Sequence, residues 1–119
     1  MTNIYGKGPK GKATRLHALI TRAHGECMKC GNTHALQCAH IISRKYSWTR
    51  TDLDNAFCLC ASCHMYFTDN PVDFGTYTIN EIGEEAYGIL LERRQLTSKV
   101  DWQEEAERLN GIARERGLI

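Results

Sequence analysis

The sequence lacks any apolar run that approaches the roughly 20 residues needed to cross a bilayer. Its first residues also lack the apolar core of a secretory signal. From these two absences we expect no membrane association, and a cytoplasmic protein that is not exported. In such a reducing compartment, closely spaced cysteines are more often metal ligands than disulfide partners.

Aromatic residues are also scarce, at 8% of the 119 residues, and the net charge is only +1. A chain this small has little core, so a metal site would contribute a large share of its stability. The near-zero net charge excludes no partner. However, residues 1–25 carry five basic side chains and no acidic one. Such a segment suits a phosphate backbone, although a solvated, disordered leader would have the same composition.

The first half of the chain predicts a helix followed by a strand, a loop, a strand and a helix. Residues 1–12 are rich in glycine and lysine and are expected to form a flexible arm. A helix is expected from Ala13 to about Gly25, because its apolar residues recur at helical spacing. Beyond it, the composition predicts strands at 36–42 and 56–59, a loop at 43–55 and a short helix at 60–67.

The last third predicts two more helices. Thr78 and Glu81 have the spacing of a capping box, and apolar residues on one face follow to about Arg94. From Trp102, apolar residues again repeat at helical spacing until Gly117. We therefore expect a C-terminal annex of two helices.

Two cysteine pairs predict a zinc site. Cys27-x-x-Cys30 and Cys60-x-x-Cys63 can each present two thiolates to one tetrahedral ion. A redox role for one pair would not need the second pair. Because cysteines would fill all four positions, no position is left for water or substrate, and the zinc is expected to be structural. The two other cysteines, 38 and 58, are expected to be small buried residues on the strands.

His40, Asn55 and His64 lie between and beside these pairs. Together with the stretches 40–44 and 63–67, they give the chain a specific resemblance to the HNH endonuclease family, over about residues 27–71 and in a branch common among phage proteins. The resemblance implies a treble-clef-like ββα-metal core. Together with the structural zinc, the N-terminal helix and the two-helix annex predicted above, it gives an expected α+β fold. The expected layout is a basic arm at 1–12, a nuclease domain at 13–75 and a helical extension packed on it at 76–119.

Phosphodiester hydrolysis needs an in-line water that loses its proton, and positive charge near the phosphoryl oxygens. His40 can be the general base if its ring is held in the right tautomer. Asn55 can brace the loop or orient that ring. His64 follows a zinc ligand, so its backbone is fixed and its imidazole can be aimed at a second, open metal. The other histidines, 17, 24 and 34, are expected to be ordinary surface or core residues.

Ala39 departs from the family pattern, in which the residue before the first histidine is an aspartate or histidine that binds the catalytic metal. Three substitutes remain open. Cys38 can supply a thiolate, His40 can bind the ion directly, or water and substrate phosphate can complete the shell. The divalent cation is expected to be Mn²⁺, Mg²⁺, Ni²⁺ or Zn²⁺, and a thiolate ligand would favour zinc.

The expected substrate is double-stranded DNA, cut to leave a 5′-phosphate and a 3′-hydroxyl, as the resemblance implies. Arg44 is the favoured phosphate contact, because the resembling sequences carry an arginine four residues after the histidine. Lys45 and Arg50 are equally compatible with a solvated loop, and Lys10 and Lys12 belong to the basic arm. A monomer is expected to nick one DNA strand. A double-strand break needs a dimer or two separate cleavage events.

Two other functions are compatible with the same residues. Loss of the ligand at Ala39 is how a nuclease domain could decay into a zinc-finger module that only binds nucleic acid. The acidic C-terminal helices can also serve a protein partner, such as a phage packaging protein, alongside either function. The oligomeric state is expected to be a monomer or a weak dimer.

Overall fold

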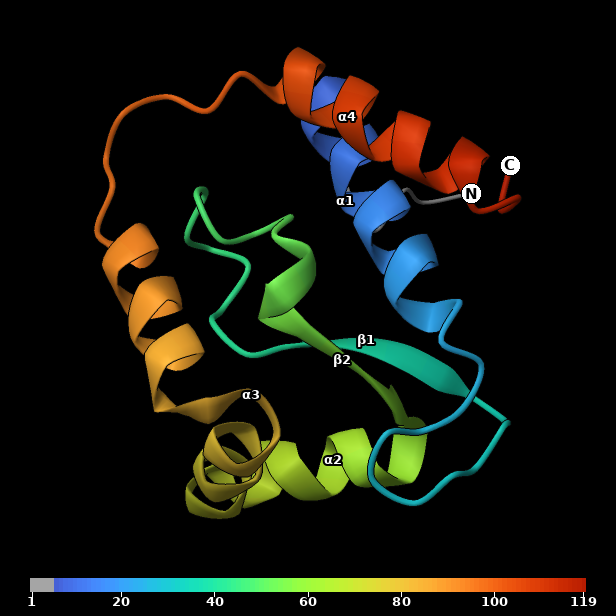
Figure 1. Ribbon diagram of the computed structural model, residues 1–119, viewed down its shortest axis with the longest axis vertical. Helices are drawn as coiled ribbons and strands as arrows, with labels where there is room; N and C mark the ends of the chain where they lie inside the picture. Colours follow the sequence, from blue (N-terminus) through green and yellow to red (C-terminus); the bar gives the residue numbers. More distant parts are fainter. Residues whose placement is uncertain (1–5) are drawn as a thin grey trace.

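The computed structural model describes residues 6–119. Its elements, in chain order, are α1 (Gly8–Arg22), β1 (Leu36–His40), β2 (Ala56–Cys60), α2 (Ala61–Asp69), α3 (Pro71–Arg94) and α4 (Trp102–Glu115), with a 3-10 turn, η1 (Leu53–Asn55), before β2 (Figure 1). Four helices around one two-stranded antiparallel sheet confirm the predicted α+β class. Within residues 6–119, no helix is long and apolar enough for a membrane span.

The hairpin of β1 and β2 lies between α1 on one side and α2 on the other (Figure 1). Cys38 is directly opposite Cys58, and Ala39 is opposite Phe57. Because successive side chains on a strand point to opposite faces, Cys38 and His40 share the face toward α1, while Ala39 and Phe57 face α2. The two faces of the hairpin therefore carry different chemistry.

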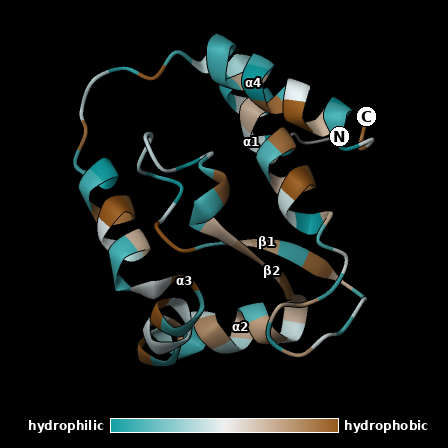
Figure 2. Cartoon of the chain, in the orientation of Figure 1, coloured by the Kyte–Doolittle hydropathy of each residue, from teal (hydrophilic) through white to brown (hydrophobic). Residues whose placement is uncertain are grey.

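The described residues form two apolar cores, and the helices show the alternating brown and teal segments of amphipathic elements (Figure 2). One core joins α1 to α4. It is formed by Ala13, Leu16, Ile20, Ala106, Leu109 and Ala113. The other joins the hairpin to α2 and the start of α3. It is formed by Cys27, Ala39, Phe57, Leu59, Cys60 and Phe67.

The first helix begins earlier than the sequence predicted. Residues 8–12 were expected in the arm but form the first turn of α1, where Pro9 is well suited because its missing N–H has no helical partner there. Lys10 lies with its Nζ 5.6 Å from the ring centroid of Trp102 in α4, and Lys12 is exposed. Docking against α4 thus offsets the poor helix propensity of this segment. Residues 1–5 of the expected arm lie outside the described residues.

The predicted start of the third helix was wrong. α3 begins at Pro71, and Thr78 lies inside it, donating its hydroxyl proton to the carbonyl of Phe74 at 2.8 Å. Gly83, at φ 84° and ψ 161°, then divides α3 into two segments. This kink interrupts the expected single apolar stripe. Beyond it, Leu90 is buried and its neighbour Ile89 is 51% exposed, so these two residues do not share one buried face.

The last helix agrees with the expected start at Trp102. The side chain of Asp101 accepts a hydrogen bond from the backbone N–H of Glu104 at 3.0 Å, as an N-cap does. Apolar residues of α4 then pack against α1, as their spacing predicted.

Candidate functional site

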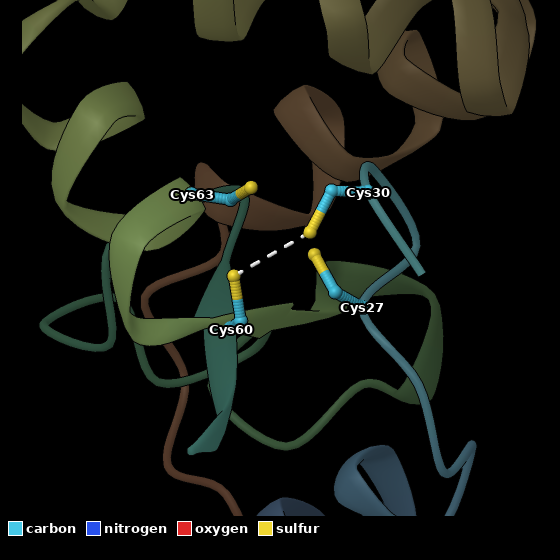
Figure 3. Close-up of side chains that lie close together, drawn as sticks. All are labelled: Cys27, Cys30, Cys60 and Cys63. Carbon is cyan, nitrogen blue, oxygen red and sulfur yellow. Dashed lines mark hydrogen bonds between the residues drawn. The ribbon is translucent and has the colours of Figure 1, made fainter. Parts of the chain in front are cut away.

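The thiols of the two expected cysteine pairs converge between the turn after α1 and the start of α2. Figure 3 shows the four side chains pointing toward one another, and their sulfur atoms lie within 4.8 Å of one another. Cys30 Sγ and Cys60 Sγ are 3.7 Å apart. This matches the edge of about 3.8 Å in a tetrahedron with Zn–S bonds of about 2.3 Å. The cluster of Cys27, Cys30, Cys60 and Cys63, here called the cysteine site, can hold one zinc ion.

Local backbone geometry prepares the first half of the cysteine site. Gly31 adopts φ +79°, which favours glycine, and its N–H donates to the carbonyl of Cys27 at 2.8 Å. The N–H of Met28 donates to the carbonyl of Cys58, also at 2.8 Å, and so attaches the turn to β2. Burial alone would raise the pKa of Cys27, but surrounding backbone N–H groups lower it to about 6. The lowered pKa favours the thiolate form of Cys27, which is the form that binds a metal cation.

A cavity of about 640 Å³ lies beside β1, between α1 and α2. Among residues 6–119, β1 pairs with β2 alone, and Leu36, Gln37, Cys38 and His40 of β1 line this cavity. The polar side chains that line the cavity come from α1, β1, the loop after β1 and α2. They include Arg22, Gln37, Cys38, His40, Arg44 and His64. The fold thus brings two of the three expected catalytic residues to one cavity, with no carboxylate among its described lining residues.

His40 is held in one tautomer. Its Nε2 lies 2.9 Å from the carbonyl oxygen of Arg50, which can only accept, so the proton is on Nε2 and Nδ1 is bare. Burial lowers the pKa of His40 to about 4, although the Arg50 carbonyl opposes that shift. The ring is therefore neutral at pH 7, with one nitrogen free to take a proton or bind a metal.

His64 is also oriented. It lies in the first turn of α2, and its Nδ1 is 2.6 Å from Oε1 of Gln37 on β1. Because Oε1 accepts, Nδ1 carries the proton and Nε2 is the bare nitrogen. Burial lowers the pKa of this imidazole from its ordinary value. His64 is thus a neutral, positioned group on the α2 side of the cavity.

Asn55 is completely buried and bonds to the loop that connects the two strands. Its Oδ1 accepts from the N–H of Ile42 at 2.7 Å. Its Nδ2 donates to the carbonyls of Ile42 and Thr49 at 3.0 and 2.8 Å. The side chain braces the loop, which is one of the two roles expected for it.

His17 was overlooked as a site residue. It is 0% exposed, its Nε2 lies 2.8 Å from the Asp52 carbonyl, and its Nδ1 lies 3.7 Å from Cys38 Sγ. Its ring centroid is 5.0 Å from that of His40. No motif links residue 17 to residues 38 and 40. The available signal was its place between Ala13 and Ile20, on the buried face of α1.

Ala39 fills the position where a metal ligand was expected from the resemblance. It is 1% exposed and packs with Phe57 and Phe67 in the core that faces α2. That face therefore offers His64 no ligating neighbour at this position. Cys38, which was expected to be a buried strand residue, instead lines the cavity on the opposite face.

The basic residues of the loop differ in placement. Arg44 and Arg22 both line the cavity, and Arg22 was not singled out from the sequence. Arg50 is held inward, because its Nε donates to Thr14 Oγ1 at 2.9 Å and its terminal nitrogen to the Arg44 carbonyl at 3.2 Å. Lys45 lies with its Nζ 5.0 Å from the ring centroid of Tyr46. The cavity's positive charge thus comes from Arg44 and from α1.

Comparison with known proteins identifies this region of the chain. The model of a family described as HNH endonuclease matches residues 19–71, somewhat under half of the 119 residues. The match begins in the second half of α1, ends at the start of α3, and contains the hairpin, α2 and the cysteine site. No curated protein and no solved structure matches the chain.

Proposed function

Residues 19–71 of this chain belong to the HNH endonuclease family, and on that premise we propose that the protein is a metal-dependent DNA endonuclease. The supporting observation is that His40, His64 and Arg44 line one cavity beside the cysteine site. The reaction is hydrolysis of a phosphodiester bond to a 5′-phosphate and a 3′-hydroxyl. With one such set of side chains among residues 6–119, a monomer nicks one strand.

The cavity offers groups for each part of this chemistry. The proton of the attacking water needs an acceptor, and His40 and His64 each present one bare ring nitrogen. Arg44 and Arg22 can hold phosphate oxygens, which places the scissile bond without reading sequence. Asn55 keeps the loop between the strands in shape, so that Arg44 stays at the cavity.

The donor set of the cavity fits a nitrogen- and sulfur-binding cation. Its imidazoles and the Cys38 thiol suit zinc or nickel better than magnesium. Magnesium prefers oxygen ligands, and the described lining of the cavity contains no carboxylate. A bound divalent ion would supply positive charge to the phosphoryl oxygens and acidify a water molecule.

Cleavage of supercoiled plasmid DNA in the presence of zinc, nickel, manganese or magnesium tests the proposal. We expect nicked circles with at least one of the ions, and a loss of about 100-fold or more in rate for His40→Ala. His34→Ala is the matched control, because His34 is exposed in the turn before β1. Plasmid that stays supercoiled with every ion overturns the proposal. Protein that binds duplex DNA but never cuts it would be the zinc-finger module instead.

A further inference from the structure

A second group of metal-ligating side chains lies on the α1 face of the hairpin. His17 from α1 and Cys38 and His40 from β1 each offer one ligand atom, and these atoms lie within 4.8 Å of one another. His17 is fully buried, whereas Cys38 and His40 line the cavity. Two members of the group therefore form part of the cavity wall, and the third, His17, lies buried behind them.

The tautomers of both imidazoles suit metal binding. His17 Nε2 donates to the carbonyl of Asp52 at 2.8 Å, and His40 Nε2 donates to the carbonyl of Arg50 at 2.9 Å. Metal-binding histidines commonly donate their second ring N–H to a backbone carbonyl in this way, which fixes the ring and frees the other nitrogen. In both rings the free nitrogen is Nδ1, and for His17 it already faces Cys38 Sγ at 3.7 Å.

The two accepting carbonyls belong to one well-held loop. Thr51, which lies between them, donates its hydroxyl proton to Glu105 of α4 at 2.6 Å. Asp52 is bound through its carboxylate to Arg93 of α3 at 2.8 Å. Contacts from two helices thus keep both carbonyls in place and hold the rings for a ligand.

We propose that His17 Nδ1, Cys38 Sγ and His40 Nδ1 bind one divalent transition-metal ion of the zinc class, and that its fourth position opens to the cavity. Three protein ligands with one open position are typical of catalytic rather than structural zinc. This site, here called the open site, replaces the ligand that Ala39 cannot supply.

The open site also assigns the role of proton acceptor. With Nδ1 of His40 bound to the ion, His64 is the imidazole in the cavity that is left to accept the proton of the water. His17 lies outside the residues that the family match covers, so this ligand is supplied by the part of α1 that precedes the match. The catalytic role of the open site rests on the proposed nuclease function, but its metal binding does not.

Metal stoichiometry and affinity test the open site without any cleavage assay. Protein saturated with zinc is expected to hold two ions per chain, one of which a mild chelator removes. Refilling the emptied site with Co²⁺ is expected to give the near-ultraviolet absorption of a cobalt–thiolate bond. Cys38→Ala and His17→Gln should each bind the exchangeable ion about 100-fold more weakly or worse, because loss of even a supporting residue costs 10- to 100-fold. His17→Gln keeps a side-chain donor for the Asp52 carbonyl.

Cys58→Ala is the matched control, since Cys58 is the register partner of Cys38 on the same face but is not a member of the group. It should keep both ions and the cobalt–thiolate absorption. The tightly held ion at the cysteine site reports that each variant is folded. The proposal is overturned if wild-type protein takes up no second ion, or if Cys38→Ala and His17→Gln bind it as tightly as Cys58→Ala does. If the open site binds as expected but no ion supports plasmid cleavage, the nuclease function fails and the metal site stands.

Discussion

The cysteine site and the open site lie at different places on one short hairpin, the first where β2 ends and α2 begins and the second where β1 packs against α1. They also differ in how they are built. The cysteine site takes both ligand pairs from tight local spacings, at 27 and 30 and at 60 and 63, and its four positions are all filled by thiols. The open site takes its three ligands from two elements, and two of them line a cavity. The first arrangement suits stability and the second suits chemistry.

The two sites also depend on different parts of the fold. The cysteine site belongs to the core of the hairpin and α2, because Cys27 and Cys60 are core members. The open site depends on α1 and on the loop between the strands, which α3 and α4 hold through Arg93 and Glu105. Changes at the first site should therefore act on folding, and changes around the second should act mainly on binding and cleavage.

The largest effect is expected from Cys30→Ser. Cys30 is exposed, so its replacement would cost less than about 0.5 kcal/mol if it bound nothing. As a zinc ligand, its loss should instead cost several kcal/mol, comparable with the whole stability of a small domain. Thermal unfolding followed by circular dichroism should show the cooperative transition lost or shifted far down, as it should for wild-type protein with a strong chelator. An unchanged transition in both cases would contradict a structural zinc.

Asn55→Ala should have the next largest effect. The buried amide makes three hydrogen bonds to the loop between the strands, and their loss leaves buried backbone groups unpaired. We expect a destabilisation of about 3 kcal/mol in chemical denaturation, together with reduced plasmid nicking because Arg44 is no longer held. Asn80→Ala, at an exposed position of α3, is the control and should be neutral. Equal stability of the two variants would show that Asn55 does not brace the loop.

The comparison of the two sites also explains what the sequence could predict. The cysteine site was predictable because the spacing within each pair brings its two thiols together, and four thiols match the ligand number of structural zinc. The meeting of the two pairs depends on the fold, which attaches the turn of the first pair to β2. The hairpin and α2 were likewise expected within a few residues of their observed ends. His17 was not predictable as a ligand, because it approaches Cys38 and His40 only through the packing of α1 on the hairpin. The start of α1 at Gly8 also depends on packing against α4 that local propensity does not contain.

Arg44→Gln should weaken DNA binding and slow DNA cleavage, and it should leave both metal sites intact. Arg44 lines the cavity. Because a phosphate contact does not read the base sequence, its loss should weaken binding equally for all DNA sequences. We expect about a tenfold slower nicking, and a salt dependence of duplex binding that is weaker by about one unit in its logarithmic slope. Arg114→Gln, exposed on α4, should change neither quantity. If both variants behave alike, the duplex does not approach this cavity through Arg44.

The smallest effect is expected for Glu105, whose carboxylate accepts a hydrogen bond from Thr51 in the loop of the open site. This effect is a pH-dependent change in the free energy of unfolding. Burial tends to raise the pKa of Glu105, but hydrogen bonds from Arg108 and Thr51 lower it below its ordinary value. A carboxylate with a lowered pKa stabilises the fold above its ordinary pKa, and this contribution is lost as the pH falls through the folded-state value. Glu105→Gln should therefore be less stable than wild type by under about 1 kcal/mol at pH 7, because the pair is partly exposed. The difference should vanish in denaturation curves measured well below pH 4. A difference that stays constant across that range would mean that the carboxylate's charge does not hold Thr51, and that α4 supports the open site by packing alone.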